Sequence, residues 1–298
     1  MDTVVIENEA MRVCVVPSYG ARVVSMVDKN SGREWMMQGL PSSNTGEDAV
    51  YAAAEAVGWD ECFPTVARWD AEGTVWGRQL RDHGYLWGCP WNVAARSDGA
   101  VTTFYSDGVF RFSRALSLTG RVLTAVYEVE NLSDRELPYL WAQHGLLGVV
   151  ASDRISIAGV ERVAATYLVV DGHILSAQTM AWPDTNGKLP FALDEVQPAS
   201  RRFAGKFYAA HVPFRRASVG HDGAFLTIEW NEGLALGIWL NYGGWPAAGG
   251  PHHIALEPTT APADHLGEAV RTETAAVVPP GGRRTWTVTL TTTEELPR

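Results

Sequence analysis

The chain has 298 residues, of which 46% are hydrophobic and 19% are charged, and its formal net charge is −10. This composition supports a substantial buried core and excludes an extensively disordered chain. The acidic balance argues against nucleic acid as a partner, because binding to a phosphate backbone depends on clustered Lys and Arg side chains. A chain of this length is compatible with two domains of about 150 residues or with one large all-β domain.

The hydropathy pattern and the cysteines bear on location. No apolar run approaches the roughly 18 to 20 residues that a membrane helix needs, and the opening MDTV segment lacks the basic start of a signal peptide. Cys14, Cys62 and Cys89 form no CxxC pair, which indicates reduced thiols and neither a disulfide framework nor a zinc knuckle. We therefore expect a cytoplasmic protein that does not contact a membrane.

Alternation of apolar and polar residues predicts strands along the whole chain. Clear examples run from Met11 to Val15, from Leu123 to Val129 and from Ala224 to Trp230. Turn signals rich in Gly, Asn, Asp and Pro separate such segments, which favours antiparallel hairpins. An alanine-rich stretch from Asp48 to Val57 predicts one short helix. Because no linker or fixed-period repeat divides the chain, we expect one all-β domain over residues 1–298, a large antiparallel sandwich.

Four loop-like segments combine aromatic, histidine and carboxylate side chains in a way that strand packing does not require. In chain order they are Gly58 to Thr65, Arg81 to Trp91, Pro138 to Gly148 and Ala255 to Ala269. Loops on a rigid scaffold commonly carry function, so these segments are the candidates for a site.

Two residues in these segments are candidates for proton transfer. His144 shares one strand face with Leu140 and Ala142, where it is either an acid in a cleft or a hydrogen-bonded interior histidine. Glu257 stands at the end of an apolar strand, just before Pro258, where it is either a base in a cleft or a salt-bridged residue at the rim.

Other candidates have the residue types used in sugar recognition. Asp60 and Glu61 follow Trp59, so carboxylate acceptors for hydroxyl groups stand beside an indole face on which a sugar can stack. The alternative for these carboxylates is hydrogen bonding within the loop. His83 precedes a glycine and either presents its imidazole to a ligand or occupies a surface turn.

Two further chemistries have weaker support. Cys62 with a distant histidine would be a nucleophile pair, but no glycine pattern of a nucleophile elbow accompanies it. A metal site in a cupin-like barrel would draw on several imidazoles and one carboxylate, although the usual HxH cluster is missing. Its ligands would come from His83, His144, His252, His253 and Glu257.

Taken together, the four segments and the opening PSYGARVVSMVDKNSGREW stretch, Pro17 to Trp35, resemble the aldose 1-epimerase (galactose mutarotase-like) superfamily. The resemblance spans nearly the whole chain, and its strength is the order in which the motifs occur. It implies a large antiparallel β-sandwich, in agreement with the alternation of apolar residues.

The resemblance also implies roles for individual residues. The segment from Glu130 to Gly148 is similar to the family stretch that carries the catalytic acid, which would be His144. The ALEPTTAPADHLGEA segment is similar to the family's closing stretch, whose glutamate is the catalytic base and would be Glu257. The DHGYLW loop resembles the one with the family's first active-site histidine, so His83 would hold the ring oxygen or a hydroxyl group. Asn241 and Asp171 fall in the interval where the family has an aspartate, without a matching motif.

The activity that the resemblance implies is interconversion of the α and β anomers of a free hexose or related aldose, with no metal or organic cofactor. The partner would be a small-molecule carbohydrate, and the assembly is a possible homodimer. Three alternatives stay open: a noncatalytic carbohydrate-binding or regulatory protein of the same fold, a hexose-phosphate mutarotase that uses Arg68, Arg78 and Arg81, and a metal-dependent sugar isomerase. The residues expected to contact the sugar are Asp60, Glu61, Trp59, Arg78, Trp141, Asn241 and Trp245.

Overall fold

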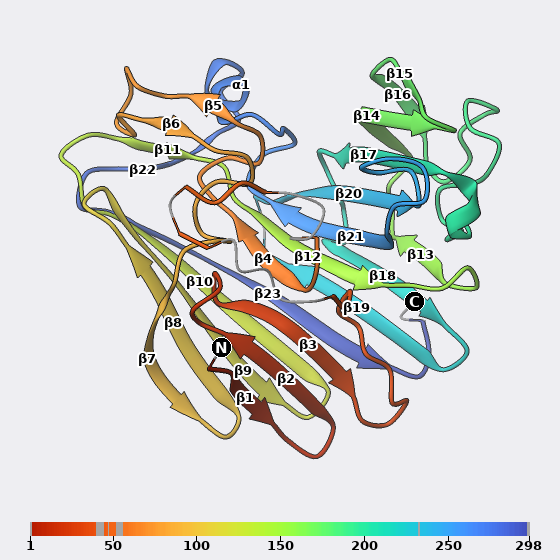
Figure 1. Cartoon of the computed structure of the whole chain (residues 1–298), viewed down its shortest axis with the longest axis horizontal. Helices are drawn as coiled ribbons and strands as arrows, with labels where there is room; N and C mark the ends of the chain where they lie inside the picture. Colours follow the sequence, from red (N-terminus) through yellow and green to blue (C-terminus); the bar gives the residue numbers. More distant parts are fainter. Residues whose placement is uncertain (1, 40–44, 47, 52–55, 232, 297–298) are drawn as a thin grey trace.

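The computed structural model describes residues 2–39, 45–46, 48–51, 56–231 and 233–296. One large sheet is built from strands of both the N-terminal and the C-terminal parts of the chain (Figure 1). Its strands are β1 (Val4–Glu7), β2 (Met11–Val16), β3 (Arg22–Asp28), β4 (Trp59–Cys62), β12 (Ala142–Gly148), β14 (Arg162–Val170), β15 (His173–Leu175), β16 (Gln178–Ala181), β17 (Phe203–Ala209), β20 (Ala235–Tyr242) and β21 (His252–Thr259). They are antiparallel in the order β1-β2-β3-β4-β12-β21-β20-β17-β14-β15, and β16 also pairs with β14.

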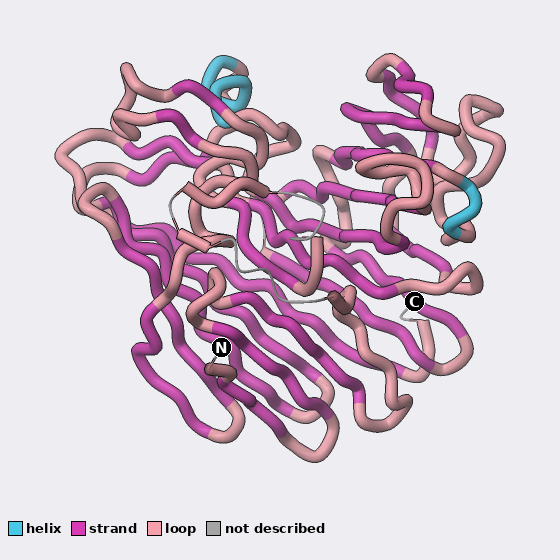
Figure 2. Tube along the Cα trace, viewed as in Figure 1, coloured by secondary structure: helices cyan, strands magenta, loops and turns pink. Residues whose placement is uncertain are grey.

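A second sheet of eight antiparallel strands faces the first (Figure 2). Its strands are β7 (Asn92–Ser97), β8 (Ala100–Ser106), β9 (Phe110–Thr119), β10 (Val122–Asn131), β13 (Arg154–Ile157), β18 (Arg216–His221), β19 (Ala224–Trp230) and β23 (Arg283–Thr293). Their order is β13-β18-β19-β23-β10-β9-β8-β7. Two short ribbons complete the strands: β5 (Trp69–Asp70) pairs with β6 (Gln79–Leu80), and β11 (Leu137–Tyr139) pairs with β22 (Ala276–Val278).

Helices are few in the described part of the chain. They are the α-helix α1 (Leu266–Arg271) and the 3₁₀ turn η2 (Ala199–Arg201). The helix expected from Asp48 to Val57 falls partly outside the described residues, and residues 48–51 and 56–57 are not helical. Among the described residues, no helix has both the length and the apolar character that crossing a membrane requires.

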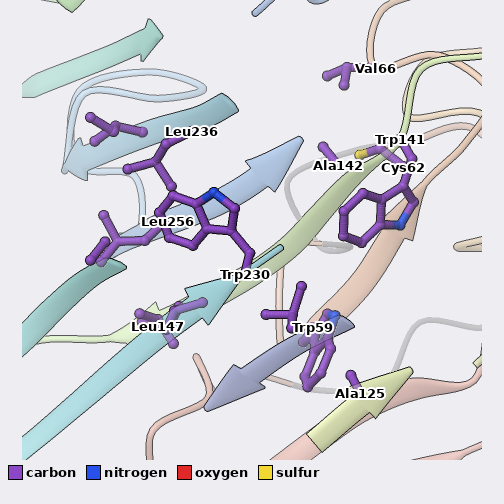
Figure 3. Close-up of a cluster of buried hydrophobic side chains, with 14 of the residues drawn as sticks. Trp59, Cys62, Val66, Ala125, Trp141, Ala142, Leu147, Trp230, Leu236 and Leu256 are labelled. Atoms are coloured by element: carbon purple, nitrogen blue, oxygen red, sulfur yellow. The ribbon is translucent and has the colours of Figure 1, made fainter. Parts of the chain in front are cut away.

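The prediction of an all-β sandwich is confirmed. The sandwich forms because apolar residues alternate with polar or exposed ones along the strands. In β10, Leu123, Ala125, Tyr127 and Val129 are fully buried, while the residues between them are more exposed. Figure 3 shows where the two sheets meet: Leu147 and Leu256 of the larger sheet share one buried cluster with Ala125 and Trp230 of the smaller sheet. The division into domains stays a prediction.

The face that a strand residue occupies decides its environment in the larger sheet. In β12 and β21, Leu147 and Leu256 belong to the core cluster between the sheets, whereas Leu146 and Ala255 belong to a separate small cluster. Since successive residues of a strand point to opposite faces, His144 and Glu257 share the outer face with Leu146 and Ala255. The strand register therefore places both candidate proton-transfer residues away from the core between the sheets.

Candidate active site

A cavity of about 390 Å³ is lined by residues of this outer face and of the connecting segments beside it. Its size lies within the roughly 300 to 1,000 Å³ typical of small-molecule sites. Charged and imidazole groups in its wall include His83, His144, Lys206 and Glu257. A wall of this kind, partly polar and partly apolar, makes the cavity the candidate active site.

Three neighbouring strands bring a carboxylate, an imidazole and a second carboxylate into one row. Asp60 of β4 pairs with His144 of β12. In the β12–β21 register Ala142 pairs with Thr259, so two residues further along β12 His144 lies opposite Glu257. Residues 60, 144 and 257 are far apart in the sequence, and the sheet is what makes them neighbours.

His144 is held by a buried carboxylate. Its Nδ1 lies 2.7 Å from Oδ1 of Asp60, and Oδ2 of Asp60 accepts a hydrogen bond from Arg22 at 2.5 Å. Burial acts to raise the pKa of Asp60, but the Arg22 guanidinium and His144 outweigh burial and hold that pKa below its ordinary value. Asp60 is therefore an anion that accepts from Nδ1–H of His144, which leaves Nε2 for exchange with a ligand.

Glu257 is paired with a buried lysine two strands away. Its Oε2 accepts a hydrogen bond from Nζ of Lys206 on β17, while its Oε1 is buried without a hydrogen-bond partner among the described residues. Burial acts to lower the pKa of Lys206, but attraction to Glu257 and Asp264 reverses that effect and raises it. Lys206 is thus a cation, and one oxygen of Glu257 stays available to a ligand.

Gly237 of β20 gives the Lys206–Glu257 pair its space. It is the register partner of Glu257, and Lys206 reaches Glu257 across it. A Cβ atom on Gly237 would lie 3.1 Å from Oε2 of Glu257 and 3.3 Å from Nζ of Lys206, closer than most real Cβ contacts. A side chain at this position would therefore crowd both members of the ion pair, which would have to shift by a few tenths of an ångström.

His83 reaches the cavity from a tight turn after β6. The residue has a φ of 60° and is followed by Gly84 with a φ of 69°. A Cβ on Gly84 would lie 1.9 Å from the carbonyl oxygen of Phe63, so only glycine fits there. The His83 ring stacks on Tyr51 with 3.7 Å between centroids and lies edge-on to His144 at 4.9 Å. The DHG motif is explained by this turn.

The imidazole of His253, another residue of the wall, is held neutral. Nε1 of Trp239 donates to Nε2 of His253 at 3.0 Å. Burial, with repulsion from His144 and His252, lowers the pKa of His253 to about 3. His253 is therefore uncharged at neutral pH and carries its proton on Nδ1.

The structure brings some of the sequence-predicted residues together and places others elsewhere. His83, His144, Glu257 and Trp245 line the cavity, and Asp60 stands directly behind His144. Lys206 was missed, although a lysine in the otherwise apolar FAGKFYA strand is a visible signal of a special role.

Glu61 lies on the opposite face of β4, between the two sheets, which corrects its assignment as a sugar contact. Its carboxylate accepts hydrogen bonds from Arg114 at 2.7 Å, from Trp141 at 2.8 Å, from Trp59 at 3.0 Å and from Tyr127 at 3.2 Å. Burial raises the pKa of Glu61 to about 7 against the pull of Arg114. Figure 3 shows Trp59 and Trp141 in the buried cluster, so these two indoles bind Glu61 and present no face to the cavity.

Arg78 and Asn241 also lie outside the cavity wall, each for a different reason. Arg78 pairs with Asp107 at 2.7 Å and lies over the ring of Tyr85. Asn241 accepts from the backbone N–H of Trp245 and donates to its carbonyl oxygen, both at 3.1 Å, so it shapes the turn that holds this indole. No arginine is among the described residues that line the cavity.

Several solved structures are similar to this chain over its full length. A galactose mutarotase-like protein from Clostridium acetobutylicum matches with a TM-score of 0.69 and 16% sequence identity, covering 98% of this chain and 95% of that one. A galactose mutarotase related enzyme from Lactobacillus acidophilus matches with a TM-score of 0.67 and 16% identity, over 99% of this chain and 100% of that one. A galactose mutarotase-like protein from Lactobacillus casei matches with a TM-score of 0.65 and 16% identity, over 98% of this chain and 100% of that one.

The chain therefore has the galactose mutarotase-like fold, and the resemblance inferred from the sequence holds at the level of the fold. A scan against protein-family models finds no match, and no curated protein matches the sequence. At these low identities the likeness defines the architecture, and the chemistry has to be argued from the cavity itself.

Proposed function

We propose that this protein is an aldose 1-epimerase, which interconverts the α and β anomers of a free aldose. One observation carries the proposal: an imidazole whose Nδ1 is fixed by a buried carboxylate stands opposite Glu257, whose Oε1 has no partner among the described residues. Ring opening of a cyclic sugar needs one acid and one base on the same molecule, and this pair supplies both.

In the ring-opening step, Oε1 of Glu257 takes the proton of the anomeric hydroxyl. The electron pair of that O–H bond forms the carbonyl, and the bond between C1 and the ring oxygen breaks. Nε2–H of His144, as imidazolium, donates its proton to the leaving ring oxygen. The Asp60 carboxylate stabilises the imidazolium through Nδ1.

Reclosure reverses these transfers after rotation about the C1–C2 bond. Neutral His144 takes the proton of the new hydroxyl, whose oxygen attacks C1 from the other face. Protonated Glu257 returns its proton to the carbonyl oxygen, which becomes the anomeric hydroxyl of opposite configuration. Both residues end in their starting protonation states, so the cycle consumes nothing.

The remaining groups hold the sugar and the base. Lys206 fixes Oε2 of Glu257, so that Oε1 is the oxygen presented for proton transfer. Trp239 and Trp245 lie edge-on to one another, with 6.1 Å between ring centroids, and provide apolar wall for the C–H faces of a sugar. His83, in the wall beside His144, serves the ring oxygen or a neighbouring hydroxyl.

The charge of the cavity favours a neutral sugar over a sugar phosphate. A hexose-phosphate mutarotase needs uncompensated cations, usually arginines that bind the phosphate through two hydrogen bonds. The one lysine among the described wall residues is already paired with Glu257, and Arg78 is paired with Asp107. The cytoplasmic location and the homodimer stay predictions from the sequence.

Polarimetry tests the proposal directly. Freshly dissolved α-glucose and α-galactose should reach their equilibrium rotation faster with the protein than without it. Glu257→Gln should reduce the catalysed rate by about 10²- to 10⁴-fold, the usual contribution of a general base. Glu195→Gln, at a half-exposed carboxylate paired with Arg154, is the matched control and should keep the rate. A protein that binds sugars without changing the rate for any aldose is a noncatalytic carbohydrate-binding protein, and this outcome overturns the proposal.

A further inference from the structure

A sulfur atom and two imidazoles meet beside the cavity. Sγ of Cys62 and one ring nitrogen each of His83 and His144 all lie within 4.8 Å of one another. Within the described residues, this is the one group of three or more His, Cys, Asp or Glu side chains close enough to share a metal ion. We propose that these three residues bind a single Zn²⁺ ion, and that the bound ion inhibits the acid/base chemistry of the cavity.

The cluster is a product of the strand register. Cys62 pairs with Ala142 across the β4–β12 ladder, and the Asp60–His144 pair is two pairs further along, so the Cys62 thiol lies on the same face as His144. Phe63, the next residue, forms a bridge with Gly84, which folds the His83 turn back over the end of β4. Three separate segments therefore converge on one point.

The donor set suits zinc. Zn²⁺ prefers thiolate sulfur and imidazole nitrogen in tetrahedral geometry, in which neighbouring ligand atoms are about 3.5 Å apart. From separations of up to 4.8 Å, the ligand atoms need to approach by about 1 Å, which small side-chain rotations supply. His83 and His144 line the cavity, so the fourth position faces water or a sugar hydroxyl.

Carboxylates stand behind both imidazoles, as they do in many zinc sites. Asp60 holds Nδ1 of His144 at 2.7 Å, and one carboxylate oxygen of Asp82 lies 3.3 Å from Nδ1 of His83. In protein zinc sites such an outer carboxylate orients the ring and increases the basicity of the coordinating nitrogen. This arrangement leaves Nε2 of His144 as the nitrogen that binds the ion.

The electrostatic field also favours a cation. Asp60 and Asp82 stand behind the two imidazoles, and Glu257 lines the same cavity, so three carboxylates lie near the cluster. Their negative charges attract a divalent ion, which binds the sulfur as a thiolate and releases the thiol proton to solvent. Without the ion, the cavity is left to the acid/base pair.

Inhibition follows because the Zn²⁺ ion and the transferred proton compete for the same lone pair, that of Nε2 of His144. This part of the inference rests on the proposed function. His144 cannot donate a proton from Nε2 to a sugar while Nε2 is bonded to Zn²⁺. The ion would therefore stop ring opening without displacing Glu257 or Lys206, and a chelator would restore the rate.

Cobalt provides a readout that needs no sugar. The full chain, stripped with a chelator, is titrated with Co²⁺, and one Co²⁺ per chain should produce a thiolate-to-cobalt band in the near ultraviolet together with the visible bands of a tetrahedral ion. Zn²⁺ should abolish these bands by displacement. Cys62→Ser should lose the near-ultraviolet band, whereas Cys14→Ser, at a buried thiol outside the cluster, should keep it.

A second variant guards against misfolding of Cys62→Ser. His83→Gln, at a partly exposed side chain, should keep the thiolate band but weaken Co²⁺ binding at least about tenfold. A wild-type spectrum without a thiolate band, or a band that persists in Cys62→Ser, overturns the site. Polarimetry with added Zn²⁺ then tests inhibition: the rate should fall at least tenfold and recover with a chelator. A Zn²⁺-loaded protein with an unchanged rate overturns inhibition, whereas a metal-free protein with no mutarotase activity overturns the proposed function alone.

Discussion

Asp60 and Glu61 are adjacent carboxylates with opposite tasks, because successive residues of β4 point to opposite faces of the sheet. Glu61, between the sheets, accepts hydrogen bonds from an arginine, a tyrosine and two tryptophans. Asp60, on the outer face, accepts from Arg22 and orients His144, which keeps one nitrogen for the cavity. A carboxylate whose donors are all structural stabilises the fold, whereas one that holds an open imidazole serves chemistry.

The largest effect is expected from removing the imidazole of His144. His144→Gln deletes the proposed acid but keeps a polar side chain of similar size beside Asp60. We expect the rate of mutarotation to fall by about 10²- to 10⁴-fold, because the leaving ring oxygen then receives no proton from the protein. Polarimetry measures the rate, and urea unfolding serves as the control, since the stability should change far less than the rate. An unchanged rate would assign the acid to another residue.

The inner carboxylate should respond in the opposite sense. Above its pKa of about 7 Glu61 is an anion, and Glu61→Gln then leaves the Arg114 guanidinium buried without that charge; breaking a buried ion pair in this way costs about 3 to 5 kcal/mol of unfolding free energy. Urea unfolding measures the loss. The folded fraction should keep the mutarotation rate per molecule, because no atom of Glu61 reaches the cavity. A variant that keeps its stability but has a lower rate would show that Glu61 contributes to the active site.

A substitution at Gly237 tests whether the geometry of the Lys206–Glu257 ion pair sets the rate. In Gly237→Ala the added methyl group crowds both Oε2 of Glu257 and Nζ of Lys206. A displacement of the base by a fraction of an ångström should lower kcat by roughly tenfold and affect KM less. Gly99→Ala is the matched control, because its new methyl group would lie no closer than 3.9 Å to a neighbour. Equal kinetics in both variants would show that the Lys206–Glu257 geometry does not set the rate.

The contrast between the carboxylates also marks how far the sequence predicts this molecule. In β10, where one face is buried, apolar and polar residues alternate in the sequence, and this pattern predicted the correct fold class. In β4 all four residues are buried, so no alternation distinguished Asp60 from Glu61, and both were assigned to sugar binding. The order of motifs placed His83, His144 and Glu257, which line one cavity.

Other positions required partners that only the sheet register reveals. Lys206 and Glu257 are 51 residues apart, and their contact depends on Gly237 from a third strand. Asn241 was expected to contact the sugar, but its side-chain amide makes hydrogen bonds to the backbone of Trp245. Such pairings follow from three-dimensional neighbours, which spacing along the chain does not encode.

The smallest expected effect concerns His253, which separates stability from chemistry within the cavity wall. Its pKa is lowered to about 3, whereas an unfolded histidine titrates near 6.5. Below about pH 6.5 the unfolded chain binds a proton that the folded chain does not, so stability is lost as the pH falls from about 6.5 toward 3. Between pH 7.5 and 5.5 this histidine should account for about 1 kcal/mol of lost unfolding free energy.

Urea unfolding at the two pH values, in the wild type and in His253→Gln, isolates this contribution. The glutamine carbonyl can still accept from Trp239 but does not titrate, so the variant should lose about 1 kcal/mol less than the wild type on going from pH 7.5 to 5.5. Comparing each protein with itself removes the constant cost of the substitution. Identical pH dependence in the two proteins would mean that His253 becomes protonated in the folded state, and the hydrogen bond from Trp239 to Nε2 would then be absent in solution.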